Sequence, residues 1–154
     1  MLVHAASASI VTYDPQKARI LADEELDVEF RRSRFPEHLG IGTIRASDGR
    51  AQLALRQEEF NTNAVHTIHG GAIAALIDLA VTAAARSVSA DVSLVLTISL
   101  TINYLMPATG DVVAEASVIS SSRRLASVKA DVLSLQGELL ATSLAQVRLL
   151  REKA

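Results

Sequence analysis

Fourteen consecutive residues near the middle of the chain are almost entirely apolar, and they limit what the rest of the chain can fold into. Between Ala72 and Ala85, 12 of the 14 residues are apolar, and seven of these are alanine. Alanine is the best helix former and a poor strand former, so this run predicts one helix over about Gly71–Val88. Because a helix that is apolar nearly all round must be buried on most sides, we expect the other elements to surround it.

The sequence on both sides of this helix has the period-two pattern of strands. Before it, Asp48-Gly49 is a strong two-residue turn signal between the segments 43–47 and 50–56. After it, apolar and polar residues alternate in four segments joined by short connections: 97–104, 112–120, 123–132 and 139–149. Consecutive strands after a single helix favour an antiparallel sheet. The predicted fold class is therefore α+β, with about six antiparallel strands wrapped around one long apolar helix.

Strict alternation also assigns side chains to the faces of these strands. In the first of the four segments it places Thr97, Ser99, Thr101 and Asn103 on one face of the sheet. In the third it places Arg123 and Lys129 on a shared face.

The length of 154 residues predicts a single domain over 1–154, large enough for a core of its own. Residues 1–40 are expected to form a helical or loose N-terminal extension. In it, Asp14-Pro15 has the pattern of an N-cap followed by a first helical residue. Phe30, Phe35 and Pro36 suggest a second short element that docks on the body of the domain.

The composition excludes several functional classes. The chain has no cysteine, which rules out a disulfide framework, a thiolate zinc site and a cysteine nucleophile. With 15 basic and 17 acidic residues and only 3% aromatic residues, no nucleic-acid partner is expected. The N-terminus lacks the pattern of a signal peptide, and the apolar run is shorter than the roughly 20 residues of a bilayer span. We therefore expect a cytoplasmic protein without a membrane partner.

The glycine pair at the start of the predicted helix is the first candidate site. Backbone N–H groups at a helix N-terminus have no intrahelical partner, and the helix dipole adds partial positive charge there. Gly70 and Gly71 also let a substrate approach the backbone closely. This combination suits a site for a carbonyl oxygen or an oxyanion. The structural alternative is a flexible loop end at the beginning of a helix.

The second candidate is Asp78, the sole ionisable residue in the apolar run. A buried carboxylate needs a partner, and a neighbouring loop or Thr82 could supply one without any function. The functional interpretation is a general base or a nucleophile. Eight residues of helix separate Asp78 from Gly70 by about 12 Å, so one helix cannot place both at one reacting carbon. If the site is catalytic, we expect a dimer in which Gly70 of one chain faces Asp78 of the other.

The remaining polar residues of interest allow weaker interpretations. His66 and His69 are three residues apart, but no third ligand with matching spacing follows, so no metal is expected. His69 is expected to fix the loop by hydrogen bonds. Asn63 could donate its amide to a carbonyl, or it could hold a turn. Arg123 and Arg124 belong to the basic cluster of the strand region and could lie on a solvated face or meet phosphates.

Taken together, these residues resemble a known family. The pattern comprises Asn63, His69-Gly70-Gly71-Ala72, Leu76, Asp78 and Ala80, then Thr97 to Ala108 (TISLTINYLMPA), Arg123-Arg124-Leu125 and Gly137-Glu138-Leu139. It is similar to the phenylacetate-pathway (PaaI-type) hotdog-fold acyl-CoA thioesterases over about 39–147. The resemblance implies a fold of one long helix wrapped by an antiparallel sheet. It also implies an acyl-CoA substrate, no cofactor, and homodimers that often pair into homotetramers.

The resemblance also implies roles for individual residues. Gly70 N–H, helped by the Asn63 side chain, would polarise the thioester carbonyl. Asp78 of the partner chain would act as general base or nucleophile, Thr97 would orient the water, and His69 would support the loop. Gly71, Arg123 and Arg124 would contact the substrate. The chain departs from the family pattern at His66 and at Ser122, where many members have glycine.

Two alternatives to a thioesterase are considered. Hotdog enoyl-CoA hydratases typically have an Asp-x-Asn-x-x-His pattern, but the matching stretch here begins with Asn61, which cannot act as a base. A non-catalytic acyl-CoA sensor or carrier would keep the pocket and lose the chemistry. The presence of Asp78 and Thr97 argues against this second alternative.

Overall fold

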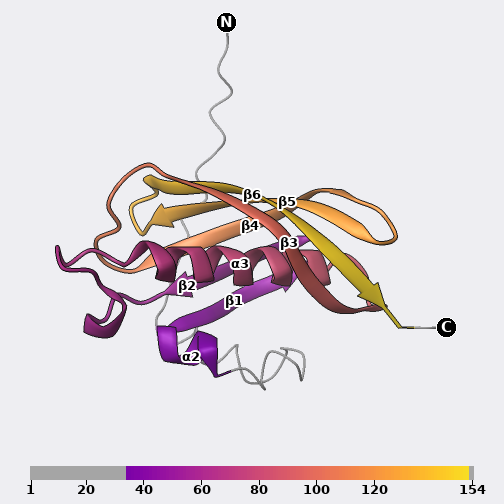
Figure 1. Cartoon of the computed structure of the whole chain (residues 1–154), viewed down its shortest axis with the longest axis horizontal. Coiled ribbons are helices and arrows are strands. Elements are labelled where there is room, and N and C mark those ends of the chain that lie inside the picture. The colour runs from indigo at the N-terminus through magenta and orange to yellow at the C-terminus, as the bar shows by residue number, and fades with distance from the viewer. Residues whose placement is uncertain (1–33, 153–154) are drawn as a thin grey trace, which may run out of the picture.

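A six-stranded antiparallel sheet curls around one long helix in the structure, a computed structural model that describes residues 34–152 (Figure 1). The long helix, α3, spans Gly70–Arg86 and lies across the concave face of the sheet. The strands are β1 (Ile41–Ser47), β2 (Arg50–Leu55), β3 (Val92–Tyr104), β4 (Val112–Ser121), β5 (Leu125–Ser134) and β6 (Leu139–Arg151). The predicted α+β class, strand number and wrapped helix are confirmed.

The order of strands in the sheet is β1-β2-β4-β5-β6-β3, and every neighbouring pair is antiparallel. The predicted turn at Asp48-Gly49 joins β1 to β2, and both residues have positive φ angles of 52° and 74°. Glycine adopts such angles without a steric cost, which explains its position there. The order leaves β3 at one edge of the sheet.

The core lies between α3 and the inner face of the sheet. Inward side chains of the strands meet the buried face of the helix, whose buried residues are Ala72, Ile73, Leu76, Ile77, Ala80, Val81, Ala83, Ala84 and Ala85. The sequence predicts burial on most sides, but one strip of the helix is only half-buried: Ala74, Ala75, Asp78, Leu79 and Thr82. Residues 34–152 thus leave part of the apolar helix surface exposed on the side that carries Asp78.

A register shift in β3 changes which face Thr97 occupies. Thr97 pairs with Val147 of β6 and Ser99 pairs with Gln146, so Ile98 is an extra residue between them. Such a bulge reverses the alternation of side chains along a strand. Thr97 therefore points toward α3, whereas Ser99, Thr101 and Asn103 remain on the outer face. The predicted shared face of these four residues is wrong for Thr97 for this reason.

Short elements complete the described part of the chain. Helix α2 (Phe35–Leu39) buries Pro36 against the domain, as predicted, whereas Phe35 is 58% exposed and Phe30 lies outside the described residues. A 3-10 turn, η2 (Glu59–Asn61), lies in the loop between β2 and α3. The predicted helix after Asp14 lies outside the described residues. Within residues 34–152, no helix has the length and apolarity needed to cross a membrane.

Candidate active site

Helix α3 begins at Gly70, and its first turn leaves one backbone donor free. His69 is the N-cap: its Nδ1 accepts a hydrogen bond from the Gly71 N–H at 2.9 Å, which confirms that His69 fixes this end of the loop. No acceptor among residues 34–152 pairs with the Gly70 N–H. A Cβ at Gly71 would lie 3.1 Å from Nδ1 of His69, whereas one at Gly70 would meet nothing closer than 3.6 Å. The glycine pair thus has two roles: Gly71 serves the cap, and Gly70 presents a free amide.

Asn63 holds the tight turn of the loop that leads into α3. Its Oδ1 accepts hydrogen bonds from the N–H groups of Val65 at 3.1 Å and Thr67 at 3.2 Å. Its Nδ2 donates to Oγ1 of Thr67 at 2.8 Å. Of the two predicted roles, turn-holding is the one visible here. One Nδ2 hydrogen remains without a partner among the described residues.

Two further side chains fasten this loop to the sheet, and sequence reasoning did not single out either for that purpose. Asn61 is 3% exposed, and its side-chain Nδ2 donates to the backbone carbonyls of Arg56 at 2.7 Å and Leu39 at 3.0 Å. The backbone carbonyl of Asn61 accepts from the His69 N–H. Gln57 donates from Nε2 to the His66 carbonyl at 2.9 Å, and its Oε1 accepts from the Gly110 N–H. Because Leu39 and Gly110 are distant in sequence from the loop, a local motif does not reveal the bonds that they make.

His66 occupies a backbone conformation that favours glycine. Its φ angle is 59°, in the left-handed region, at the exposed tip of the Asn63 turn. This gives a physical reason for the glycine found there in many proteins of the resembled family. Its imidazole is exposed, and Nδ1 of His69 is already used in the cap. Among residues 34–152 no three His, Asp or Glu side chains gather to hold a metal ion.

Asp78 lies near the middle of α3 on the half-buried strip and is held by the edge strand. The Thr97 hydroxyl donates to Oδ1 of Asp78 at 2.7 Å. Thr82, the alternative partner considered from the sequence, donates instead to the backbone carbonyl of Asp78 at 3.0 Å. The structure therefore brings Asp78 and Thr97 together, with one carboxylate oxygen paired to the hydroxyl.

The candidate residues form two groups within one chain. Gly70, Gly71, His69 and Asn63 gather at the start of α3, whereas Asp78 and Thr97 meet about 12 Å further along the helix axis. Ala74 and Ala75 lie between the two groups on the same half-buried strip. Because both groups belong to one rigid helix, no side-chain rotation brings the Gly70 amide to the Asp78 carboxylate.

An apolar pocket of about 350 Å³ opens beside Gly70. Its lining includes Ile68, Ile73, Met106 and Leu140, with the Tyr104 ring on one side. The Tyr104 hydroxyl donates to the Gly70 carbonyl at 2.9 Å. The pocket offers apolar surface next to a free backbone donor, which is the usual composition of a small-molecule site.

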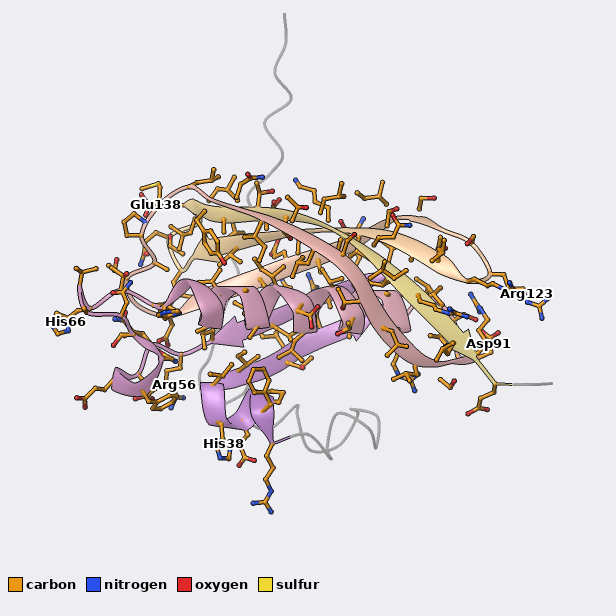
Figure 2. All side chains as sticks on the ribbon, in the orientation of Figure 1. His38, Arg56, His66, Asp91, Arg123 and Glu138 are labelled. Atoms are coloured by element: carbon orange, nitrogen blue, oxygen red, sulfur yellow. The ribbon has the colours of Figure 1, made fainter. Side chains whose placement is uncertain are left out.

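Arg123 and Arg124 lie far from the start of α3 in the same chain. Both precede β5, which begins at Leu125, so Arg123 is not on a strand and does not share a strand face with Lys129, contrary to the parity argument. Figure 2 shows Arg123 and His66 at opposite ends of the molecule. Near Arg123, Asp91 accepts hydrogen bonds from Ser89 and Arg151, and these bonds lower the pKa of its carboxyl.

Comparison with known proteins places this arrangement in a family. The sequence profile of the Thioesterase superfamily matches residues 66–141, which include Gly70, Asp78 and Thr97. A curated Halobacterium salinarum protein that carries an esterase name is 42% identical over 89 residues. That match covers 53% of this chain and 57% of the relative, so the chain spans little more than half of that protein's length.

Solved structures agree with this assignment over most of the chain. A mutant of the phenylacetic acid degradation protein PaaI from Thermus thermophilus is 28% identical, with a TM-score of 0.70, over 77% of this chain and all of that one. A solved structure of another thioesterase superfamily protein is 30% identical, with a TM-score of 0.70, over 79% of this chain and 92% of that one. The chain belongs to the thioesterase superfamily, and its fold is the hotdog fold of the PaaI proteins.

The Asn61 side chain gives a prediction about the loop. Asn61→Asp should lower the free energy of unfolding by about 3 kcal/mol, because a buried carboxylate would face two carbonyl oxygens. Asn63→Asp is the matched control: at position 63 a carboxylate would accept from two N–H groups and the Thr67 hydroxyl, so stability should change little. Urea unfolding of both variants measures the difference. Equal losses would contradict the assigned bonding of Asn61.

The positive φ of His66 gives a second prediction. His66→Gly should be about 1 kcal/mol more stable than His66→Ala in urea unfolding, because an L side chain costs about that much in the left-handed region. The same pair at Val65, which has no positive φ, should show the opposite order, since glycine there adds only chain entropy. The same order at both positions would show that residue 66 does not adopt this conformation in solution.

Proposed function

We propose that this chain is an acyl-CoA thioesterase that hydrolyses a thioester to the free acid and coenzyme A. One observation carries the proposal: α3 presents a free amide at Gly70, at its start, and a hydroxyl-held carboxylate at Asp78, on its half-buried strip. These are the two groups that thioester hydrolysis requires, a donor for the carbonyl oxygen and an acceptor for the proton of water. Membership of the thioesterase superfamily supports the same reaction class.

The separation of the two groups favours a site shared between two chains. Strand β3 is 13 residues long and lies at the sheet edge. Two of its apolar residues are exposed to solvent, Leu96 by 47% and Ile98 by 57%. Pairing of β3 with a second β3 would cover this edge and extend the sheet. It would also bring the half-buried helix strips together, where Ala74 and Ala75 permit close approach. In an antiparallel pair of helices, Gly70 of one protomer then lies opposite Asp78 of its partner.

The reaction follows from this juxtaposition. Asp78 removes a proton from a water molecule, and the oxygen of that water attacks the thioester carbon. Negative charge develops on the carbonyl oxygen, where the Gly70 N–H and the dipole of α3 stabilise it. The carbon–sulfur bond then breaks, and the thiolate of coenzyme A takes up the proton. Direct attack by the Asp78 carboxylate, with later hydrolysis of the anhydride by water, uses the same geometry.

Single turnover in heavy-oxygen water separates these two routes. Attack by water places the label directly in the released acid. Attack by Asp78 forms an anhydride. When water then attacks the Asp78 carbon of this anhydride, the label enters the Asp78 side chain and the released acid carries an unlabelled oxygen from Asp78, so label in Asp78 identifies this route.

Other predicted residues have places in this assembly. The apolar pocket beside Gly70 suits the acyl group, and the remaining Nδ2 hydrogen of Asn63 is available to assist at the carbonyl. The antiparallel arrangement also brings the Arg123 and Arg124 end of one protomer toward the start of α3 in the other, which suits contact with the phosphates of coenzyme A. The outer face of the sheet, with Leu144 56% exposed, remains available for the expected pairing of dimers into a tetramer.

The first test measures thiol release from a panel of aryl and aliphatic acyl-CoA thioesters. Asp78→Asn should lower kcat by about two to four orders of magnitude, because the amide cannot accept a proton. Asp131→Asn is the matched control: this carboxylate lies on the outer sheet face, paired with Lys129 and Thr142, and its loss should leave kcat unchanged. Undiminished turnover in Asp78→Asn would contradict the role of this residue.

The wild type in the same assay decides between enzyme and carrier. Turnover of any acyl-CoA supports the thioesterase. Binding of acyl-CoA without turnover would instead identify the non-catalytic carrier.

The second test asks whether the site is shared. Gly70→Pro removes only the free N–H at the first helical position, where proline is well tolerated, and His69 already has the extended conformation that precedes proline. It should lower kcat by about 100-fold or more relative to Gly70→Ala, which keeps the donor. Gly70→Pro and Asp78→Asn refolded together should recover about a quarter of wild-type activity, since half the dimers gain one complete site.

The absence of any recovery in the mixture would contradict a shared site and favour one within a single chain. Native mass spectrometry of the same mixture, which distinguishes the two variants by their different protomer masses, confirms that mixed oligomers have formed.

A further inference from the structure

We infer that Tyr104 is a positioning residue that fixes the Gly70 amide for the reaction, an inference that rests on the proposed thioesterase function. Tyr104 is the last residue of β3, and its hydroxyl donates to the Gly70 carbonyl at 2.9 Å. Tyr104 is 54% exposed as a residue, and the Cε1 and Cζ atoms of its ring would lie 3.6 Å from a Cβ at Gly70. Its hydroxyl bond is the specific interaction that ties this exposed residue to α3.

Gly70 needs such a restraint more than any other residue type would. Glycine has the widest choice of backbone angles, and the first turn of a helix lacks the hydrogen bonds that hold the interior. The two peptide units that flank the Gly70 Cα are both held here. In the first, the His69 carbonyl accepts from the N–H groups of Ala72 and Ile73; in the second, the Gly70 carbonyl accepts from the Tyr104 hydroxyl, and the Gly71 N–H donates to His69 Nδ1. The Gly70 N–H belongs to the first unit and is left as the free donor, and the backbone angles of Gly70 are restrained before a substrate arrives.

The same strand restrains the other reacting group. The bulge at Ile98 turns Thr97 to the inner face of β3, where Tyr104 also lies, and Thr97 donates to Asp78. Two hydroxyls from one strand therefore hold the oxyanion donor and the carboxylate. Because a misplacement of about 1 Å can cost about 100-fold in rate, loss of either hydroxyl should be visible in kcat.

The test is Tyr104→Phe, which removes the hydroxyl and keeps the ring. We expect kcat for acyl-CoA hydrolysis to fall about tenfold, with KM changed less than twofold, because the ring still lines the pocket and only the alignment of the donor is lost. Thr101→Val is the matched control. It removes a hydroxyl from the same strand, on the outer face, that has no hydrogen-bond partner among residues 34–152, and it should leave both constants unchanged.

A second measurement separates alignment from general loosening of the fold. In the Asp78→Asn background, the carbonyl stretching frequency of a bound acyl-CoA reports the hydrogen bond to its oxygen. Adding Tyr104→Phe should shift this frequency toward the value of the free thioester, whereas adding Thr101→Val should not. A structural defect alone would lower occupancy without moving the frequency of the bound fraction.

The outcomes are distinguishable from failure of the proposed function. Wild-type protein without turnover of any acyl-CoA contradicts the thioesterase, and the positioning role with it. Wild-type turnover combined with an unchanged kcat and carbonyl frequency in Tyr104→Phe overturns the positioning role alone. A fall in kcat with the frequency shift supports it.

Discussion

The rigidity of α3 is the constraint on which the rest of the structure depends. An α-helix rises about 1.5 Å per residue, and no rotamer change alters the distance between its backbone amide at Gly70 and a side chain at Asp78. The apolar, alanine-rich composition of the helix favours burial, yet residues 34–152 leave the Asp78 strip only half-buried. Packing and chemistry therefore both favour the proposed pairing, in which a second α3 lies against this strip.

The fold could be predicted from the sequence because its signals are local. Alanine content defines α3, period two defines the strands, and Asp48-Gly49 defines the first hairpin. The face of the sheet on which Thr97 lies could not be predicted from the sequence. The bulge at Ile98 that determines it is a feature of the pairing between β3 and β6, and no residue at the bulge signals it. Alternation is reliable only within an uninterrupted ladder, and one extra residue reverses it.

The candidate site shows the same division. The approximate helix start and the carboxylate at Asp78 follow from sequence, since each is a property of a residue and its immediate neighbours, whereas the cap at His69 is known only from the structure. The hydrogen-bond partners of Asp78 and Gly70 do not follow from sequence: Thr97 is 19 residues from Asp78, and Tyr104 is 34 residues from Gly70. Asn61 shows what sequence alone does not reveal. From the sequence it stands where a hotdog hydratase would have its catalytic Asp. In the structure its buried side-chain amide donates to two backbone carbonyls, which is a structural reason for an asparagine at this position.

Strand β3 links assembly to chemistry in this fold. Its inner face supplies the hydroxyls of Thr97 and Tyr104 to α3, and its free edge is the surface on which a second copy would pair. The two functions use different parts of the strand, the side chains for one and the backbone edge for the other, so pairing need not disturb either hydroxyl bond. Each protomer can therefore hold its amide and its carboxylate in place before association. Association then has to bring together only groups that are already oriented, which is the condition under which fixed dipoles stabilise a developing charge most effectively.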